Sequence, residues 1–221
     1  MVSLEKLLTS SVHLGHKVQQ WNPKMSPYIY GERNGVHIID LLQTLICLER
    51  VCFFLKNIKR NKKNVLFVST KPQFASVIQS YALSCNAHYV NQRWLGGMLT
   101  NWSTIRKCIN GLQLLIKQES DGSWDRVSKK EALVLKKRKA KLERYFMGLL
   151  NMNSLPDVVI LIGQHRELNA VKECIKLKIP LITILDTNCD PTMTDFLVPA
   201  NDDSIASVSL ILEEFCNSLK I

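Results

Sequence analysis

The sequence predicts an α/β protein with a mainly parallel sheet covered by helices on both faces. Short apolar runs at 65–68, 158–162 and 181–185 are rich in Val, Ile, Leu and Phe, which is typical of strands buried on both sides. Helical patterns alternate with these runs, and such alternation indicates a parallel sheet. The region 100–149 contains two amphipathic stretches, which predict an antiparallel helical hairpin inserted into this framework.

The first forty residues predict one short helix followed by mostly irregular chain. We expect the helix over 3–12, and Asn-Pro and Ser-Pro pairs indicate that 16–35 is a loop. A hairpin turn is expected around 33–35, followed by a short strand at 37–39. Asp40 is placed to cap the long helix that comes next.

The end of that helix is basic. Residues 50–64 contain six cations and no acidic residue. Cations stabilise the C-terminus of a helix, and the same charges would suit contact with RNA. Both interpretations are open at this point.

The segment after the strand at 65–68 is where a dinucleotide-binding enzyme carries its glycine-rich loop. Neither G-x-G-x-x-G nor a Walker-type loop is present. Thr70 and Lys71, at the start of the next helix, could still hold one phosphate of RNA or of a nucleotide. A further strand is expected at 88–90.

The stretch 90–102 joins that strand to the hairpin. A Gly-Gly pair predicts a tight turn, and Thr100 and Asn101 are both suitable N-caps for the helix that follows. Arg93 and Trp94 flank the turn. The tryptophans could pack in the core, or the turn could be a surface that contacts a large anion.

The hairpin at 100–149 carries much of the positive charge. A polar loop at 120–123 separates its two helices, and Ser128 with Glu131 predicts a capping box. Residues 126–144 contain nine Lys and Arg against two acidic residues. A solvated charged arm and an arm that contacts RNA would both show this pattern.

The C-terminal third ends with a short predicted strand at 196–198 and a final helix. Four aspartates follow the predicted strands of this third: Asp186, Asp190, Asp202 and Asp203. Ligands bind at the carboxyl ends of parallel strands, so an enzyme could use these groups as acids, bases or Mg²⁺ ligands. We favour capping and turn formation, with Asp202 at the helix start, because no nucleophile or phosphate cradle accompanies them.

The composition points to a polyanionic partner. The 221 residues are 46% hydrophobic, which is enough for one substantial core, and the net charge is +10. Residues 1–150 contain 24 cations against 9 acids, whereas 151–221 contain 5 against 10. A polyanion would therefore meet the first two thirds of the chain.

The seven cysteines are scattered, without a C-x-x-C pair. This spacing argues against a disulfide framework or zinc ribbon and favours a reducing compartment. No apolar run is long enough to span a bilayer, and the N-terminus has no signal or transit pattern. We therefore expect no membrane partner.

Three blocks of sequence, in the same order, resemble the small-subunit ribosomal protein S-two family. They are QRWLGGMLTNW at 92–102; VHLGH at 12–16, WNPKM at 21–25 and YGERNGVHIID at 30–40; and LPD at 155–157, IP at 179–180, DTNCDP at 186–191 and PANDD at 199–203.

The resemblance implies a single domain over 1–221 with a flavodoxin-like three-layer α/β/α sandwich. Its core would be 1–99 and 150–221, with the helical hairpin at about 100–149 inserted. It also implies a structural constituent of the small ribosomal subunit that binds rRNA and neighbouring ribosomal proteins. No enzyme activity, cofactor, metal or small-molecule substrate is expected.

We expect RNA contacts from basic residues and one tryptophan of the first two thirds of the chain. These are Lys17, Lys24, Arg33, Lys71, Arg93, Trp94, Lys129, Lys130, Lys136, Lys137, Arg138 and Lys139. The sequence leaves open whether His13, His16, Asp186, Asp202 or Asp203 hold a metal ion. The alternatives are a phosphate- or nucleotide-binding α/β enzyme and an extra-ribosomal RNA-binding relative of the family.

The resemblance and the composition together indicate a plastid-encoded form that works in the chloroplast stroma. Lys outnumbers Arg 20 to 9, as in AT-rich genomes, and Asn188-Cys189-Asp190 resembles a plastid variant. A bacterial cytoplasm or a mitochondrion is the alternative.

Overall fold

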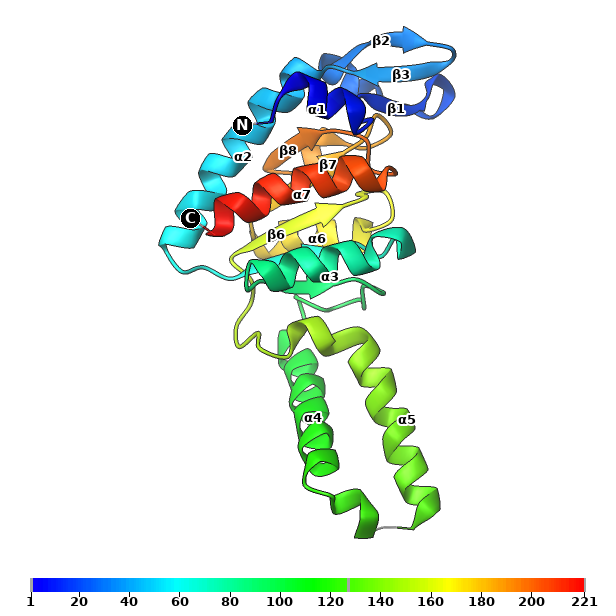
Figure 1. Cartoon of the computed structure of the whole chain (residues 1–221), viewed down its shortest axis with the longest axis vertical. Coiled ribbons are helices and arrows are strands. Elements are labelled where there is room, and N and C mark those ends of the chain that lie inside the picture. Colours follow the sequence, from blue (N-terminus) through cyan, green and yellow to red (C-terminus); the bar gives the residue numbers. More distant parts are fainter. Residues whose placement is uncertain (1, 127, 221) are drawn as a thin grey trace.

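A five-stranded parallel sheet forms the centre of the molecule in the computed structural model, which describes residues 2–126 and 128–220 (Figure 1). The strand order is β5-β4-β6-β7-β8, and every neighbouring pair is parallel. The strands are β4 (Val65–Val68), β5 (His88–Val90), β6 (Val158–Ile162), β7 (Leu181–Leu185) and β8 (Phe196–Pro199). The predicted α/β fold with a parallel sheet is confirmed.

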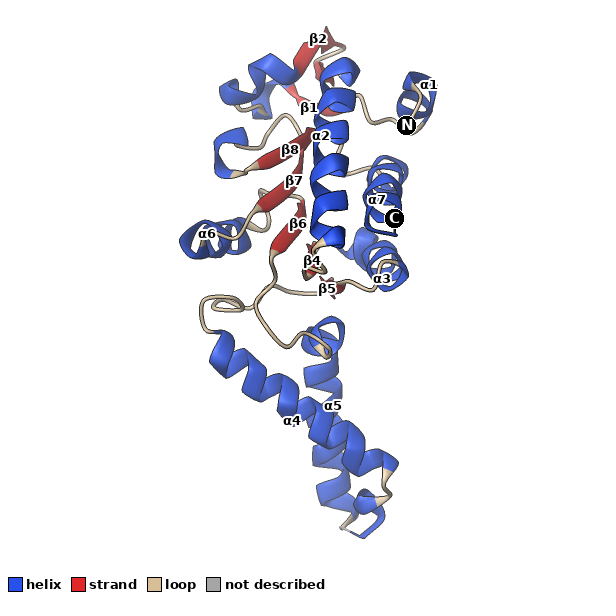
Figure 2. Cartoon of the chain, turned by 90° about the vertical axis from the view of Figure 1, so that its left-hand side faces the viewer, coloured by secondary structure: helices blue, strands red, loops and turns tan. Residues whose placement is uncertain are grey.

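Helices cover both faces of this sheet, as Figure 2 shows. One face packs against α2 (Leu41–Arg60), α3 (Ala75–Ser84) and α7 (Ile205–Lys220), and the short α1 (Leu4–Thr9) lies beside them. The other face packs against α6 (Leu168–Leu177) and the base of the hairpin. Alternate residues of a strand point to opposite faces, so Phe67 joins the first core cluster and Leu66 the second.

A second, three-stranded antiparallel sheet lies near the N-terminus. Its order is β1 (Leu14–Lys17), β3 (Val36–Ile39), β2 (Ile29–Arg33). Asn34 and Gly35, with φ of 55° and 76°, form the predicted hairpin turn between β2 and β3. The expectation of a loop over 16–35 was partly wrong, because β1 and β2 overlap its ends. Neither strand shows the apolar alternation that marks a half-buried strand; their pairing with β3 forms them.

The helical hairpin follows β5 and projects from the sheet (Figure 1). It consists of α4 (Trp102–Ser120) and α5 (Lys129–Phe146), and the capping box of Ser128 and Glu131 is present as predicted. Asn101 occupies the N-cap of α4 but makes no capping hydrogen bond through its side chain. The division of the chain into a core and an insertion at about 100–149 stays a prediction.

Candidate functional site

The turn between β5 and α4 is held by a carboxylate from the opposite half of the chain. Glu173, which is 9% exposed, reaches the turn from α6. Its oxygens accept hydrogen bonds from Nε1 of Trp94 (3.0 Å), the backbone N–H groups of Gly97 (2.8 Å), Leu99 (2.9 Å) and Thr100 (3.0 Å), and the hydroxyl of Thr100 (3.1 Å). Burial alone would raise the pKa of Glu173, but these donors together hold it below its usual value.

Sequence reasoning missed Glu173. A single glutamate within a helical pattern looks like a solvated residue, and its partners lie more than seventy positions away. The only available sign was the turn itself, whose backbone N–H groups need acceptors when buried.

The structure separates the two residues predicted to present this turn to RNA. The Arg93 side chain is exposed. Trp94 is 7% exposed and belongs to the second core cluster with Met98 and Leu99. The expectation for Trp94 is therefore corrected: its ring is packed inside and its N–H is bound to Glu173, so it offers no stacking surface to a nucleic-acid base.

Most of the predicted RNA-contacting cations are exposed. Within the described residues, no ion pair is found for Lys17, Arg33, Arg93, Lys129, Lys130, Lys136, Lys137 or Arg138.

Three predicted cations lie beside carboxylates instead. Nζ of Lys24 lies 2.7 Å from Asp190. Lys71 pairs with Asp202 and Asp203, and Lys139 pairs with Glu119 of α4 and with Glu143 one turn along α5. These partners partly neutralise the charges, so we expect less phosphate binding from them than from the unpaired cations.

A further basic surface lies at the end of α2. A cavity of about 220 Å³ there is lined by Lys59, Lys62 and Lys63 together with Asn64 and His88. These lysines belong to the basic run at 50–64, which the predicted set of contact residues left out. Lys59 lies in the last turn of α2, and Lys62 and Lys63 follow it, where cations interact favourably with the helix dipole.

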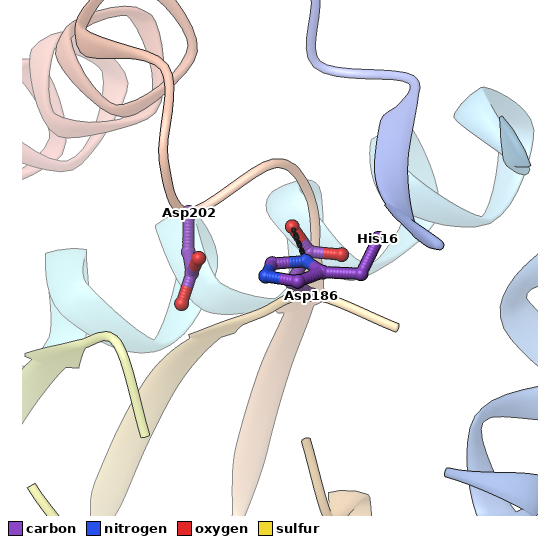
Figure 3. Close-up of side chains that lie close together, drawn as sticks. All are labelled: His16, Asp186 and Asp202. Carbon is purple, nitrogen blue, oxygen red and sulfur yellow. Dashed lines mark ion pairs between the residues drawn. The ribbon is translucent and has the colours of Figure 1, made fainter. Parts of the chain in front are cut away.

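A group of ionisable side chains gathers at the carboxyl end of the parallel sheet. We call it the His16 cluster and define it as His16, Lys71, Asp186, Asp202 and Asp203. Nδ1 of His16 lies 3.0 Å from Asp186 and its Nε2 lies 3.4 Å from Asp203. Nζ of Lys71 lies 2.8 Å from Asp202 and 2.9 Å from Asp203. Figure 3 shows His16, Asp186 and Asp202 close together.

The backbone brings His16 to this position by a close approach that requires glycine. A Cβ on Gly15 would lie 2.6 Å from Cγ2 of Thr187 and 3.0 Å from the carbonyl oxygen of His37, which is too close for another residue. The N–H of His16 then donates to Oγ1 of Thr187 at 2.9 Å. This hydrogen bond and the close backbone approach hold β1 against the turn that follows β7.

The aspartates of the cluster differ from what the sequence predicted. Asp186 does accept hydrogen bonds from its own turn, at the N–H and hydroxyl of Thr187. Asp202 does not cap the last helix: the hydroxyl of Ser204, the residue before α7, accepts the N–H of Ser207 instead at 3.4 Å. The capping expectation for Asp202 was wrong because its carboxylate turns inward to Lys71, and burial raises its pKa.

The side chains of Thr70 and Lys71, which could have held a phosphate, are already bound to carboxylates. The N–H and hydroxyl of Thr70 both donate to Glu167, and the ammonium of Lys71 is bound to two aspartates. The groups that would hold a phosphate are thus already paired with carboxylates, which would repel one.

A family model described as "Ribosomal protein S2" matches residues 7–220 of the chain. The chain belongs to this family. Among its relatives, "Small ribosomal subunit protein uS2c" of Euglena gracilis is 58% identical over 219 residues, which are 99% of this chain and 91% of the relative. The protein of the same name from Mesostigma viride is 53% identical over 99% of this chain and 96% of its own length. "Small ribosomal subunit protein uS2" of Trichormus variabilis is 48% identical, covering 99% and 83%.

Membership of the S2 family confirms the resemblance seen in the three sequence blocks. In the structure, the block at 92–102 contains the turn that Glu173 holds, and the blocks at 12–16, 186–191 and 199–203 contribute every member of the His16 cluster except Lys71. Residues 2–126 and 128–220 contain no helix with the length and apolar character needed to cross a bilayer.

Proposed function

We propose that this chain is a structural constituent of the small ribosomal subunit, where it binds rRNA and neighbouring ribosomal proteins in translation. The observation that carries this function is the near full-length match to relatives named small ribosomal subunit proteins, at up to 58% identity over 99% of the chain. The family model, which spans residues 7–220, supports the same assignment.

We propose that the rRNA is contacted by the exposed, unpaired cations. On the globular part these are Lys17, Arg33 and Arg93, and on α5 they are Lys129, Lys130, Lys136, Lys137 and Arg138. An unpaired surface cation neutralises a phosphate without breaking an existing ion pair, so it gains the most from releasing counterions. Lys24, Lys71 and Lys139 are secondary candidates, because each would have to give up an ion pair with a carboxylate to bind a phosphate. Trp94 is left out of the proposed RNA contacts because its ring is buried.

The protein has no catalytic role in this proposal. The donors at Thr70 and Lys71, where an α/β enzyme of this topology would hold a phosphate, are engaged by Glu167, Asp202 and Asp203. Calorimetry of the purified chain with NAD and with ATP is expected to show no binding. Micromolar affinity for either nucleotide would revive the enzyme alternative.

We propose the plastid stroma as the place of action. Several relatives named uS2c come from algae, and 20 Lys against 9 Arg suits an AT-rich genome. Relatives named uS2 from cyanobacteria keep a bacterial cytoplasm as the alternative. Location of the gene on a plastid genome would support the first, and location on a bacterial chromosome would contradict it.

Sedimentation tests the ribosomal function directly. A tagged copy of the chain is expected to move with the small subunit through a sucrose gradient and to stay with it at high salt, because a resident protein makes many contacts. A chain that remains at the top of the gradient, or leaves the subunit in moderate salt, would favour the extra-ribosomal alternative.

A further inference from the structure

The His16 cluster contains more negative charge than its own cations neutralise. Asp186 and Asp202 are 1% and 3% exposed, so neither is solvated like a surface carboxylate. With Asp203 they carry three negative charges, and Lys71 supplies one positive charge. The cluster thus sets three carboxylates against one ammonium and one imidazole, and the contact with Asp186 raises the pKa of that imidazole. A divalent cation held by the carboxylates and a neutral imidazole would offset the remaining negative charge, and buried carboxylates without such compensation are costly.

Two polar atoms of the cluster, one from His16 and one from Asp202, lack a well-formed hydrogen bond within the described residues. Nδ1 of His16 is buried and, despite its 3.0 Å approach to Asp186, makes no hydrogen bond of acceptable geometry among the described residues. Asp202 uses Oδ1 for Lys71, and no hydrogen bond to its Oδ2 is found within the same part of the chain. Thus Oδ2 of Asp202 and, in the neutral imidazole, Nδ1 of His16 have no hydrogen bond within the described residues that would compete with a ligand.

The three side chains are close enough to share one ion. One ligand atom from each of His16, Asp186 and Asp202 lies within 4.8 Å of the other two. Ligands at about 2.0–2.2 Å from a tetrahedral zinc ion lie roughly 3.4 Å from one another. The three ligand atoms would therefore have to move closer together by up to about 1.4 Å to complete the geometry.

We propose that His16, Asp186 and Asp202 bind one divalent transition-metal cation, for which zinc is the reference ion. This site uses none of the exposed, unpaired cations that we propose to contact the rRNA. An imidazole nitrogen combined with two carboxylates suits zinc and its neighbours better than Mg²⁺ or Ca²⁺, which prefer oxygen ligands alone. An adjoining cavity of about 290 Å³, lined by Asp203 and Gln20 among others, leaves room for water as a fourth ligand.

The cation would also tie together three segments distant in sequence. His16 comes from β1, Asp186 follows β7 and Asp202 precedes α7. The ring nitrogen of His16 that does not bind the metal can donate to Asp203, whose Oδ2 lies 3.4 Å from Nε2. A histidine ligand is commonly oriented by such a carboxylate.

Zinc binding to the full chain tests this proposal. The chain is stripped of metal with a chelator under reducing conditions, and zinc is then titrated against a chromophoric competitor, with stoichiometry from elemental analysis. We expect one zinc per chain, and binding at least about tenfold weaker in His16→Gln and in Asp186→Asn. His165→Gln is the matched control, because its side chain is exposed and it should bind zinc like the native chain.

Two further measurements keep the test decisive if a variant fails to fold. The absorption spectrum of the native chain with Co²⁺ should show nitrogen and oxygen ligation without a thiolate charge-transfer band. Zinc should also raise the melting temperature of the native chain. Absence of binding, equal binding by His16→Gln, or a thiolate spectrum from the cysteines would each overturn the proposal and leave the cluster as a network of ion pairs.

Discussion

The globular part and the helical hairpin differ in whether their charged side chains are buried with partners or exposed without them. In the globular part, Glu173 and Lys71 are largely buried and surrounded by specific partners. On α5, most cations are exposed and have no ion pair within the described residues. Buried charges need partners because desolvation is costly, whereas exposed cations contribute little to folding and remain available to an external anion. The comparison suggests that charge in the first region maintains the fold and charge in the second serves binding.

Substitution of the buried tryptophan of the turn should have the largest effect. Trp94→Ala removes a large ring from the second core cluster and leaves Glu173 without one donor, so we expect a loss of about 3–5 kcal/mol in the free energy of unfolding. Urea denaturation measures it. Trp102→Ala, at a half-buried ring, is the matched control and should cost less. Equal losses would show that burial does not distinguish the two rings.

Substitution of Glu173 should have the second-largest effect on stability. Glu173→Gln keeps the shape but turns an NH₂ group toward backbone N–H donors, so at least one buried donor loses its acceptor. We expect a loss of roughly 2–3 kcal/mol. Glu143→Gln, in the hairpin, serves as control and should change the unfolding free energy by less than about 0.5 kcal/mol. A neutral effect of Glu173→Gln would mean that the turn does not depend on this carboxylate.

Acid pH should reduce the difference in unfolding free energy between the native chain and the Glu173→Gln variant. The pKa of Glu173 is lowered in the folded state, so its stabilising contribution is fully present above the unfolded pKa of about 4.3 and is lost as pH falls through the folded pKa. Unfolding measured from neutral to acid pH for both chains isolates this contribution, because the other carboxylates are common to both. A difference that stays constant down to strongly acid pH would contradict the assignment.

The hairpin cations should show the smallest effect on stability and a clear effect on binding. Replacing Lys136 and Lys137 by Gln should reduce the slope of log affinity against log salt by about 1.5 units if both neutralise phosphates. Binding to small subunits that lack this protein, measured over a range of KCl concentrations, gives the slope. The melting temperature should hardly change.

Lys139→Gln is the control for that experiment, because Lys139 already pairs with Glu119 and Glu143 and should contribute little to the salt dependence. If the double variant leaves the slope unchanged and assembles normally, the hairpin is an arm that contacts protein instead of RNA.

Local sequence patterns were sufficient for most of the secondary structure. The apolar runs at 65–68, 158–162 and 181–185 became strands with those bounds, and Asp40 caps α2 as predicted. The Asn34-Gly35 turn and the capping box at Ser128 also formed where expected. Such features depend on residues within a few positions of one another, so their information is contained in a short stretch of sequence.

The sequence by itself therefore determined the strands of the parallel sheet, the helical hairpin, the caps at Asp40 and Ser128 and, through its ordered motifs, the family. Only the tertiary structure decided which polar groups meet. Trp94 packs in the second core cluster, where Glu173, 79 positions away, accepts its N–H, and Lys71 pairs with Asp202, 131 positions away. The His16 cluster likewise combines four distant segments, around positions 16, 71, 186 and 202. Such contacts depend on how whole elements pack, and a residue's type and immediate neighbours do not reveal which distant partner will share its environment.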